Sequence, residues 1–336
     1  GHGAWEAAVS NVLAAGDTVL VLATGRFCVG WGEMASSLGV NVETIDFGGQ
    51  DTIDVNQVQD HLRADTSGRI KAVMAVHVDT STSVLNDISA LRKAMDASGH
   101  GGLLMVDCIA SLGCDEFRMD DWGVDIMVSA CQKGLMTPPG IAFVFFSEKA
   151  ADTRNNMERV SAYWDWNPRV EPELYYQYFC GTAPTQHLLG LREALDMIRE
   201  EKLPHIWQRH ETLAKAVWAA CSAWGQDGPL LMNISDPAFR SRAVTALAIG
   251  APDGKRLRRW TEYQAGVTLG IGLNMGTAED PNADGFFRIG HMGHVNAQMI
   301  MGTLGSIQAG LIALDIPHGA GGLDAAAQAL ASQVPS

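Results

Sequence analysis

The sequence predicts an α/β fold in which helices cover both faces of a central sheet. Two observations carry this prediction. Helical and strand patterns alternate along the first half of the 336-residue chain, and the strands are continuous apolar runs. Such strands are typical of a sheet buried on both faces. The pattern changes near residue 200, so we expect a large domain over residues 1–200 and a small α+β domain over residues 201–336.

The expected strands are short apolar runs, and the expected helices are segments in which apolar residues recur at helical spacing. The strands are placed at residues 18–23, 41–47, 70–78, 103–109, 125–129, 141–146, 243–249 and 286–289. The helices are placed at residues 5–14, 25–38, 54–64, 87–97 and 184–201, and from residue 203 onward. Asp54 is expected to cap the third of these helices, and the chain to end in a Gly-rich tail.

Composition excludes several classes of function. The chain has 24 Lys and Arg residues against 38 Asp and Glu residues, a net charge of −14, which disfavours binding to nucleic acids or anionic membranes. No apolar run approaches the roughly 20 residues of a membrane-spanning helix. The start at Gly1 has neither an initiating Met nor the pattern of a signal peptide, so we expect that a preceding segment is missing.

The cysteine and histidine patterns argue against metal and redox sites. Six cysteines are scattered without a C-x-x-C pair, which predicts reduced cysteines in a cytoplasmic protein. His291 and His294 have metal-ligand spacing, but no carboxylate or cysteine cluster accompanies them. We therefore expect no metal.

The candidate chemistry lies at strand ends, where open α/β sheets place functional groups. Lys133 follows an apolar strand and precedes a loop stiffened by Pro138-Pro139-Gly140. Asp107 ends the strand before it. A lysine amine condenses with an aldehyde, and a fixed carboxylate keeps a pyridine nitrogen protonated. Together these groups suit pyridoxal phosphate as the cofactor.

That cofactor also needs an anion site and two walls for its ring. Gly1-His2-Gly3 directly precedes the first helix, whose start offers free N–H groups to a phosphate. Phe27 follows the first strand and is a candidate for one ring face, and Ile109 for the other.

Four motifs, in order along nearly the whole chain, resemble the class V aminotransferases, with the alanine–glyoxylate and serine–glyoxylate aminotransferases as the nearest branch. The spacing between Asp107 and Lys133, 133 − 107 = 26 residues, also matches the family. The motifs are Gly1-His2-Gly3-Ala4-Trp5-Glu6-Ala7-Ala8, Val106-Asp107-Cys108-Ile109-Ala110-Ser111-Leu112-Gly113, Gln132-Lys133-Gly134 with Pro138-Pro139-Gly140, and Phe287-Arg288-Ile289-Gly290. The resemblance implies a pyridoxal-phosphate-dependent transferase of fold type I, with a mostly parallel, seven-stranded sheet in the large domain.

The resemblance also implies roles for individual residues. Lys133 would bind the cofactor aldehyde and later move the α-proton of the substrate, and Asp107 would pair with the pyridinium nitrogen. Phe27 corresponds to the stacking aromatic residue, which is often Trp in the family, and Ile109 to the aliphatic residue on the opposite face. Arg288 matches the arginine that binds the substrate α-carboxylate with its planar fork.

Other positions match residues around the phosphate and the ring. Gly1, His2 and Gln132 match phosphate-side positions, and Thr80 matches a hydroxyl residue near the ring. Thr182 resembles the residue that reaches the cofactor phosphate of the neighbouring subunit, which implies a homodimer.

Two departures from the family pattern concern the substrate site. The family chain begins several dozen residues earlier, with an arm and a Pro-Gly-Pro segment that help to close the site. Some relatives carry Tyr where this chain has Phe179, so the hydroxyl contact across the dimer is lost or passes to Tyr178.

The sequence therefore predicts a transaminase that moves an amino group from a small amino acid, of the alanine or serine type, to glyoxylate or pyruvate. One alternative is a lyase of the same fold, such as a cysteine desulfurase, although that chemistry expects a His where Gln132 precedes the lysine. A second is an NAD-dependent dehydrogenase, although the glycine fingerprint is missing after residues 18–23. A non-catalytic protein is disfavoured by the set Asp107, Lys133 and Arg288.

Overall fold

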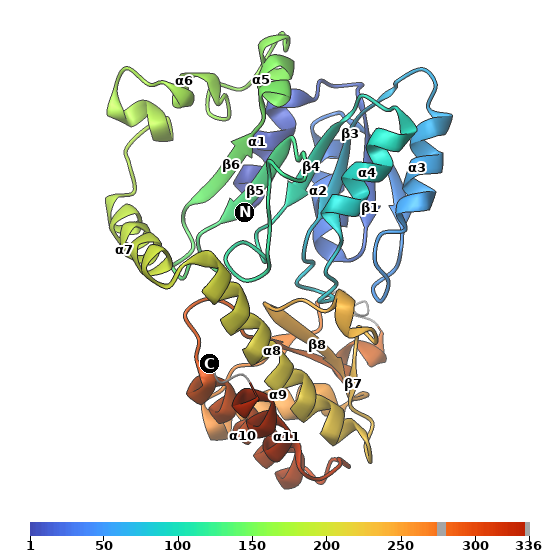
Figure 1. Ribbon diagram of the computed structural model, residues 1–336, viewed down its shortest axis with the longest axis vertical. Coiled ribbons are helices and arrows are strands. Elements are labelled where there is room, and N and C mark those ends of the chain that lie inside the picture. Colours follow the sequence, from blue (N-terminus) through green and yellow to red (C-terminus); the bar gives the residue numbers. More distant parts are fainter. Residues whose placement is uncertain (274–279, 333–336) are drawn as a thin grey trace.

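A six-stranded, mostly parallel sheet forms the centre of the first half of the chain in the computed structural model, which describes residues 1–273 and 280–332 (Figure 1). Its strand order is β2-β1-β3-β4-β5-β6, and only β6 runs antiparallel to its neighbour. The strands are β1 (Thr18–Ala23), β2 (Asn41–Asp46), β3 (Ile70–Val76), β4 (Leu103–Asp107), β5 (Ile126–Ala130) and β6 (Ala142–Phe146).

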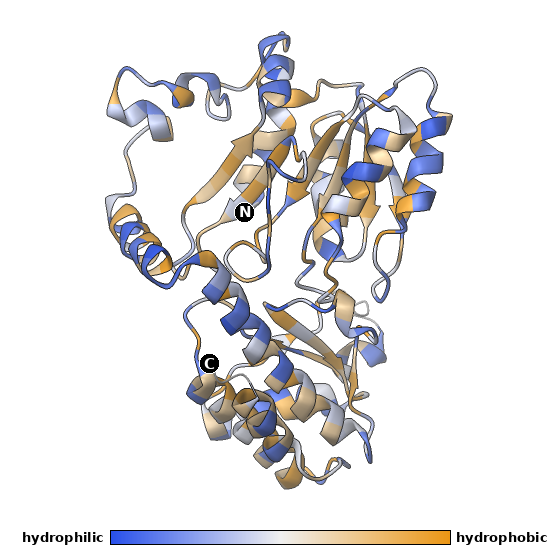
Figure 2. Ribbon diagram, viewed as in Figure 1, coloured by the Kyte–Doolittle hydropathy of each residue, from blue (hydrophilic) through white to orange (hydrophobic). Residues whose placement is uncertain are grey.

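Helices cover both faces of this sheet, and each face has its own apolar core. Helices α1 (His2–Val12) and α2 (Arg26–Ser37) pack on one face, and α3 (Val55–Ala64) and α4 (Ile88–Ser98) on the other. Successive residues of one strand alternate between the two cores, so β1 directs Val19 and Val21 to the first and Leu20 and Leu22 to the second. Figure 2 shows the resulting concentration of apolar residues in the strands.

A second, four-stranded sheet with the order β7-β8-β10-β9 forms the centre of the later part of the chain. Its strands are β7 (Leu231–Met232), β8 (Val244–Ala248), β9 (Gly270–Ile271) and β10 (Phe286–Gly290). Helices α8, α9, α10 and α11 contribute to its core, which includes Trp224, Phe287 and Leu304. These helices are α8 (Leu203–Gly225), α9 (Asp253–Ala265), α10 (Ala297–Ala313) and α11 (Gly322–Ala331).

A mainly helical stretch joins the two parts. It consists of α5 (Glu148–Asn155), α6 (Asn167–Val170), the 3₁₀ helix η1 (Tyr175–Phe179) and α7 (Thr185–Glu201). Two further 3₁₀ helices are η2 (Pro237–Phe239) and η3 (Pro281–Gly285). The expected division at residue 200 falls close to Lys202, which separates α7 from α8, and it stays a prediction. Within the described residues, no helix is long and apolar enough to cross a bilayer.

The predicted α/β class is confirmed, and each predicted strand is present with ends shifted by a few residues. The large sheet has six strands in the described residues and not the expected seven. Only the family resemblance implies a seventh strand. The Gly-rich tail contains the helix α11, because Gly321 adopts a left-handed conformation (φ 81°) and an Ala-rich segment follows it.

Candidate functional site

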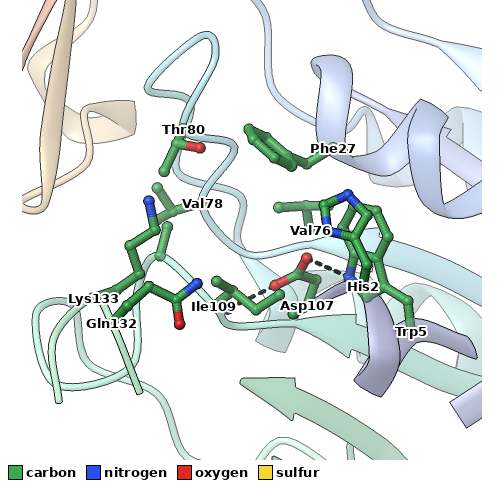
Figure 3. A pocket seen from close by; sticks show the side chains of 12 residues that line it. His2, Trp5, Phe27, Val76, Val78, Thr80, Asp107, Ile109, Gln132 and Lys133 are labelled. Carbon is green, nitrogen blue, oxygen red and sulfur yellow. Dashed lines mark hydrogen bonds between the residues drawn. The ribbon is translucent and has the colours of Figure 1, made fainter. Parts of the chain in front are cut away.

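A cavity of about 140 Å³ opens at the carboxyl ends of β3, β4 and β5. Eight of the ten predicted site residues line it (Figure 3). They come from the start of α1, from α2 and from the segments that follow the three strands. The complete lining consists of Gly1, His2, Trp5, Phe27, Val76, Val78, Thr80, Asp107, Ile109, Ala110, Gln132 and Lys133.

Lys133 reaches the cavity from a loop whose backbone is tightly packed. The next residue, Gly134, lies so close to Leu112 that a Cβ atom would stand 2.0 Å from the Leu112 carbonyl oxygen. On the other side, a Cβ on Gly293 would stand 3.2 Å from the carbonyl oxygen of Lys133. Burial, and then the positive charge of Arg288, lower the pKa of Lys133. A lowered pKa leaves more of the amine neutral, which is the nucleophilic form.

Asp107 lies at the end of β4, and it is 3% exposed. Its Oδ1 accepts a hydrogen bond of 2.6 Å from the backbone N–H of Ile109, and its Oδ2 accepts one of 2.7 Å from the indole N–H of Trp5 (Figure 3). Burial raises the pKa of Asp107 to about 7, and the two hydrogen bonds oppose this rise.

Phe27 and Ile109 lie on opposite sides of the space around Asp107 in Figure 3. Phe27 is held through its backbone, because its N–H donates a 2.9 Å hydrogen bond to Oδ2 of the buried Asp79. Asp79 itself leaves no room at Gly25, where a Cβ would stand 2.4 Å from the Asp79 Cγ. The two side chains are therefore placed to wall a flat ring.

The start of α1 forms another wall of the cavity. Gly1 is the N-cap of this helix, and the first N–H groups of a helix have no intrahelical acceptor. The Ile109 Cδ1 atom stands 2.5 Å from where a Cβ on Gly1 would be, so a larger residue here would displace the Ile109 side chain. The free N–H groups and the helix dipole together favour an anion here.

Arg288 lies on β10 of the second sheet and does not line the cavity itself. Its Nη1 donates a 2.6 Å hydrogen bond to the carbonyl oxygen of Thr80, which does line the cavity. Its Nε donates a 2.7 Å hydrogen bond to the carbonyl oxygen of Ile271. The two bonds hold the guanidinium group near the cavity and near the charge of Lys133.

Thr182 is exposed and lies outside the central cavity. It lines a second, more open cavity of about 560 Å³ that also includes Gly1 and Gln132. Tyr178 and Phe179 line the same space. The structure therefore places Thr182 in a space next to Gly1 and Gln132 but outside the lining of the central cavity.

Sequence reasoning missed four residues of the lining, namely Trp5, Val76, Val78 and Ala110. Trp5 is the most important of the four for the site, because its indole N–H donates a hydrogen bond to Asp107, 102 residues away in sequence. A large aromatic residue one helical turn after Gly1 was the available signal, but the same pattern equally predicts core packing.

The cavity residues fit pyridoxal phosphate. A half-buried lysine with a lowered pKa stands on one side, and a buried carboxylate stands on the other. Apolar side chains wall the space between them, and a helix start with free N–H groups adjoins it. This set offers a suitable contact for each part of the cofactor, namely its aldehyde, its pyridine nitrogen, its planar ring and its phosphate.

Comparison with known proteins agrees with this fit. The family model for Aminotransferase class-V matches residues 2–255. The chain is 36% identical to the serine–glyoxylate aminotransferase of Methylorubrum extorquens, over 93% of this chain and 76% of that protein. It is 35% identical to the enzyme of the same name from Arabidopsis thaliana, over 92% of this chain and 75% of that protein.

Among solved structures, the pyridoxamine–pyruvate aminotransferase of Mesorhizobium loti superposes with a TM-score of 0.87 at 26% identity, covering 99% of this chain and 83% of that one. Neither the lyase nor the dehydrogenase alternative is better supported by these relatives. The chain belongs to the class V aminotransferases, an enzyme family whose cofactor is pyridoxal phosphate.

Proposed function

We propose that this protein transfers the amino group of a small amino acid to glyoxylate or pyruvate, as a cytoplasmic homodimer. The observation that carries the proposal is the placement of Lys133 and Asp107 around one cavity, with Arg288 bound to the Thr80 carbonyl at its edge. Relatives named for serine and glyoxylate support the choice of substrates.

In this proposal, Lys133 binds the cofactor covalently, and Asp107 pairs with the ring nitrogen. Phe27 and Ile109 hold the ring between them. When bound, the cofactor supplies an electron sink that stabilises negative charge at the α-carbon of the substrate. Once the amino group of the substrate has replaced Lys133 on the cofactor, the freed amine of Lys133 would take the α-proton, and its lowered pKa suits this task because the neutral amine is the base.

The phosphate group is assigned to the free N–H groups at the start of α1, with His2 and Gln132 beside them. Thr80 is assigned to the edge of the ring. Burial lowers the pKa of the Arg288 guanidinium, but it stays far above neutrality in any protein, so the group remains a cation for the α-carboxylate of the substrate.

The proposed homodimer rests on the exposed aromatic residues between β6 and α7. Tyr163, Tyr175, Tyr176 and Tyr178 are each at least half exposed, an unusual cluster for a monomer surface. The cluster adjoins Thr182, which supports the assignment of Thr182 to the site of a partner subunit. Sedimentation should give twice the mass of one chain, and a monomeric species that is fully active would contradict this assignment.

All six cysteines are free and five of them are buried, which supports a reducing compartment such as the cytoplasm. Fractionation of cells that express the protein should recover it in the cytoplasmic fraction.

Substrate choice is tested by a screen of serine, alanine, aspartate and pyridoxamine as amino donors against glyoxylate, pyruvate and oxaloacetate. We expect the highest kcat/KM for serine or alanine with glyoxylate or pyruvate. Turnover confined to pyridoxamine, or an absence of turnover with every pair although the cofactor is bound, would contradict the proposal.

A further inference from the structure

The hydrogen bond from Trp5 to Asp107 involves a residue that the sequence analysis does not assign to the site. Among the described residues, the Asp107 carboxylate accepts hydrogen bonds only from Trp5 and Ile109, and no cation forms an ion pair with it. The bond from Ile109 is a local one from the backbone two residues on. Trp5 is therefore the one side chain that stabilises the charge of Asp107 by direct contact.

Trp5 is fixed in place from several directions. Its ring stacks on Trp31 with the centroids 6.1 Å apart and the planes 17° from parallel, and its edge faces Phe27. The indole N–H of Trp31 donates a 3.3 Å hydrogen bond to the backbone carbonyl of Trp5. Trp5 is 2% exposed, so its N–H group points at Asp107 with little freedom to turn away.

The chemistry of the two groups makes this contact directional. An indole N–H can donate a hydrogen bond but cannot accept one, so it favours the ionised carboxylate over the protonated acid. Water is largely excluded from this carboxylate, which is 3% exposed, and an unmet oxygen there would destabilise the anion.

We propose that Trp5 is a positioning residue that keeps the Asp107 carboxylate ionised and aimed into the cavity, where it pairs with the protonated ring nitrogen of the cofactor. This inference rests on the proposed function, because it assumes that Asp107 faces that nitrogen. Burial raises the pKa of Asp107 to about 7 even though the hydrogen bonds from Ile109 and Trp5 oppose the rise, so loss of the Trp5 bond should raise this pKa further.

Other ionisable groups also face Asp107, and they stay constant when Trp5 is changed. They come from the start of α1, from α2 and from the segments that follow β3, β4 and β5. These groups are the amino group of Gly1, His2, Cys28, Asp79, Cys108 and Lys133. A comparison of variants at one pH therefore isolates the contribution of Trp5.

The test is the affinity of the cofactor-free protein for pyridoxamine phosphate between pH 6 and pH 9. This probe keeps the ring nitrogen and the phosphate but has no aldehyde, so the titration of Lys133 does not enter through a covalent bond. Trp5→Phe keeps a ring against Trp31 and removes the donor. A hydrogen bond to a charged group is worth about one to two pKa units, so we expect binding weakened about 10- to 100-fold near pH 6. The difference in affinity between Trp5→Phe and wild type should become smaller as the pH rises, because Asp107 then ionises in both proteins.

Trp166→Phe is the matched control, because it makes the same change in the same core at a residue that stacks on Phe146 and not on Trp5, and it should bind within about twofold of wild type at every pH. Asp107→Asn should bind weakly at every pH. If Trp5→Phe loses affinity for pyridoxamine phosphate by the same factor at every pH, or loses none, the inference is overturned and the proposed function still stands. If wild type itself fails to bind the probe, the proposed function fails instead.

A second measurement needs no stable Trp5 variant. In wild-type protein with ¹⁵N-labelled tryptophan, the indole signal that moves in Asp107→Asn belongs to Trp5. We expect that signal to titrate near neutral pH together with Asp107. A Trp5 signal that stays constant over pH 5 to 9 would overturn the inference.

Discussion

Arg288 on the second sheet donates a 2.6 Å hydrogen bond to the carbonyl oxygen of Thr80, 208 residues earlier in the chain. This contact brings the only arginine assigned to the substrate against the segment that follows β3. In the proposed site Arg288 therefore comes from the second sheet, and the position of its guanidinium group depends on how the two parts of the chain meet.

The first prediction concerns the planar guanidinium group of Arg288. Arg288→Lys keeps the positive charge but loses the planar donors that match a carboxylate. We expect KM for the amino acid to rise about 10- to 100-fold, the value of a hydrogen bond between charged groups, while pyridoxamine phosphate binds as in wild type. A KM that stays within twofold of wild type would remove Arg288 from the substrate site.

The second prediction concerns the backbone beside Lys133. Gly134→Ala places a methyl group 2.0 Å from the Leu112 carbonyl oxygen, so the loop must shift and displace Lys133. We expect at least a hundredfold loss of kcat, because catalysis needs the amine within about one ångström of its position. Gly302→Ala in α10 is the control, since nothing lies within 4 Å of its Cβ position. Equal activity of both variants would show that the loop adapts.

The third prediction concerns acid stability. His210 on α8 is fully buried, its Nε2 accepts a 3.1 Å hydrogen bond from the Gly293 N–H, and burial lowers its pKa to about 4. Below pH 6.5 the unfolded chain binds a proton at this histidine, and the folded protein does not until about pH 4. The free energy of unfolding therefore falls as the pH is lowered through this window, by about 1.4 kcal/mol per pH unit from this group.

Urea unfolding of His210→Gln across pH 4 to 7 measures this contribution. His77 and His291 titrate in the same direction as His210, and Asp107 and Asp115 in the opposite one. All four groups are present in both proteins, so the difference in slope reports His210. His205→Gln is the control, because it makes the same change at an exposed histidine on the same helix. Parallel curves for wild type and His210→Gln would contradict the assignment.

Much of the site could be predicted because its residues follow strands in sequence. Asp107 and Lys133 come at or just after the ends of β4 and β5, and parallel neighbours bring such positions together at one edge of the sheet. The apolar runs predict the two strands, and the juxtaposition follows because the structure pairs β4 with β5. The mostly parallel order and the place of Arg288 came from the family resemblance.

The remaining features depend on contacts that no local pattern encodes. Trp5 has the spacing of a core residue, and it is one, since it packs with Trp31 in the first core. Its bond to Asp107 arises only because α1 packs on the face of the sheet near the end of β4. Similarly, Arg209 donates hydrogen bonds to the carbonyl oxygens of Gly293 and Val295, and these bonds join segments more than 80 residues apart.

The central claim is that Lys133 binds the cofactor, and one labelling experiment tests it most directly. The protein is incubated with pyridoxal phosphate, reduced with borohydride, digested and analysed by mass spectrometry. We predict a yellow protein with the pyridoxyl label on Lys133, no retained label in Lys133→Ala, and normal labelling in the control Lys93→Ala, which changes an exposed lysine. A label confined to other lysines, or a wild-type protein that acquires none, would contradict the account.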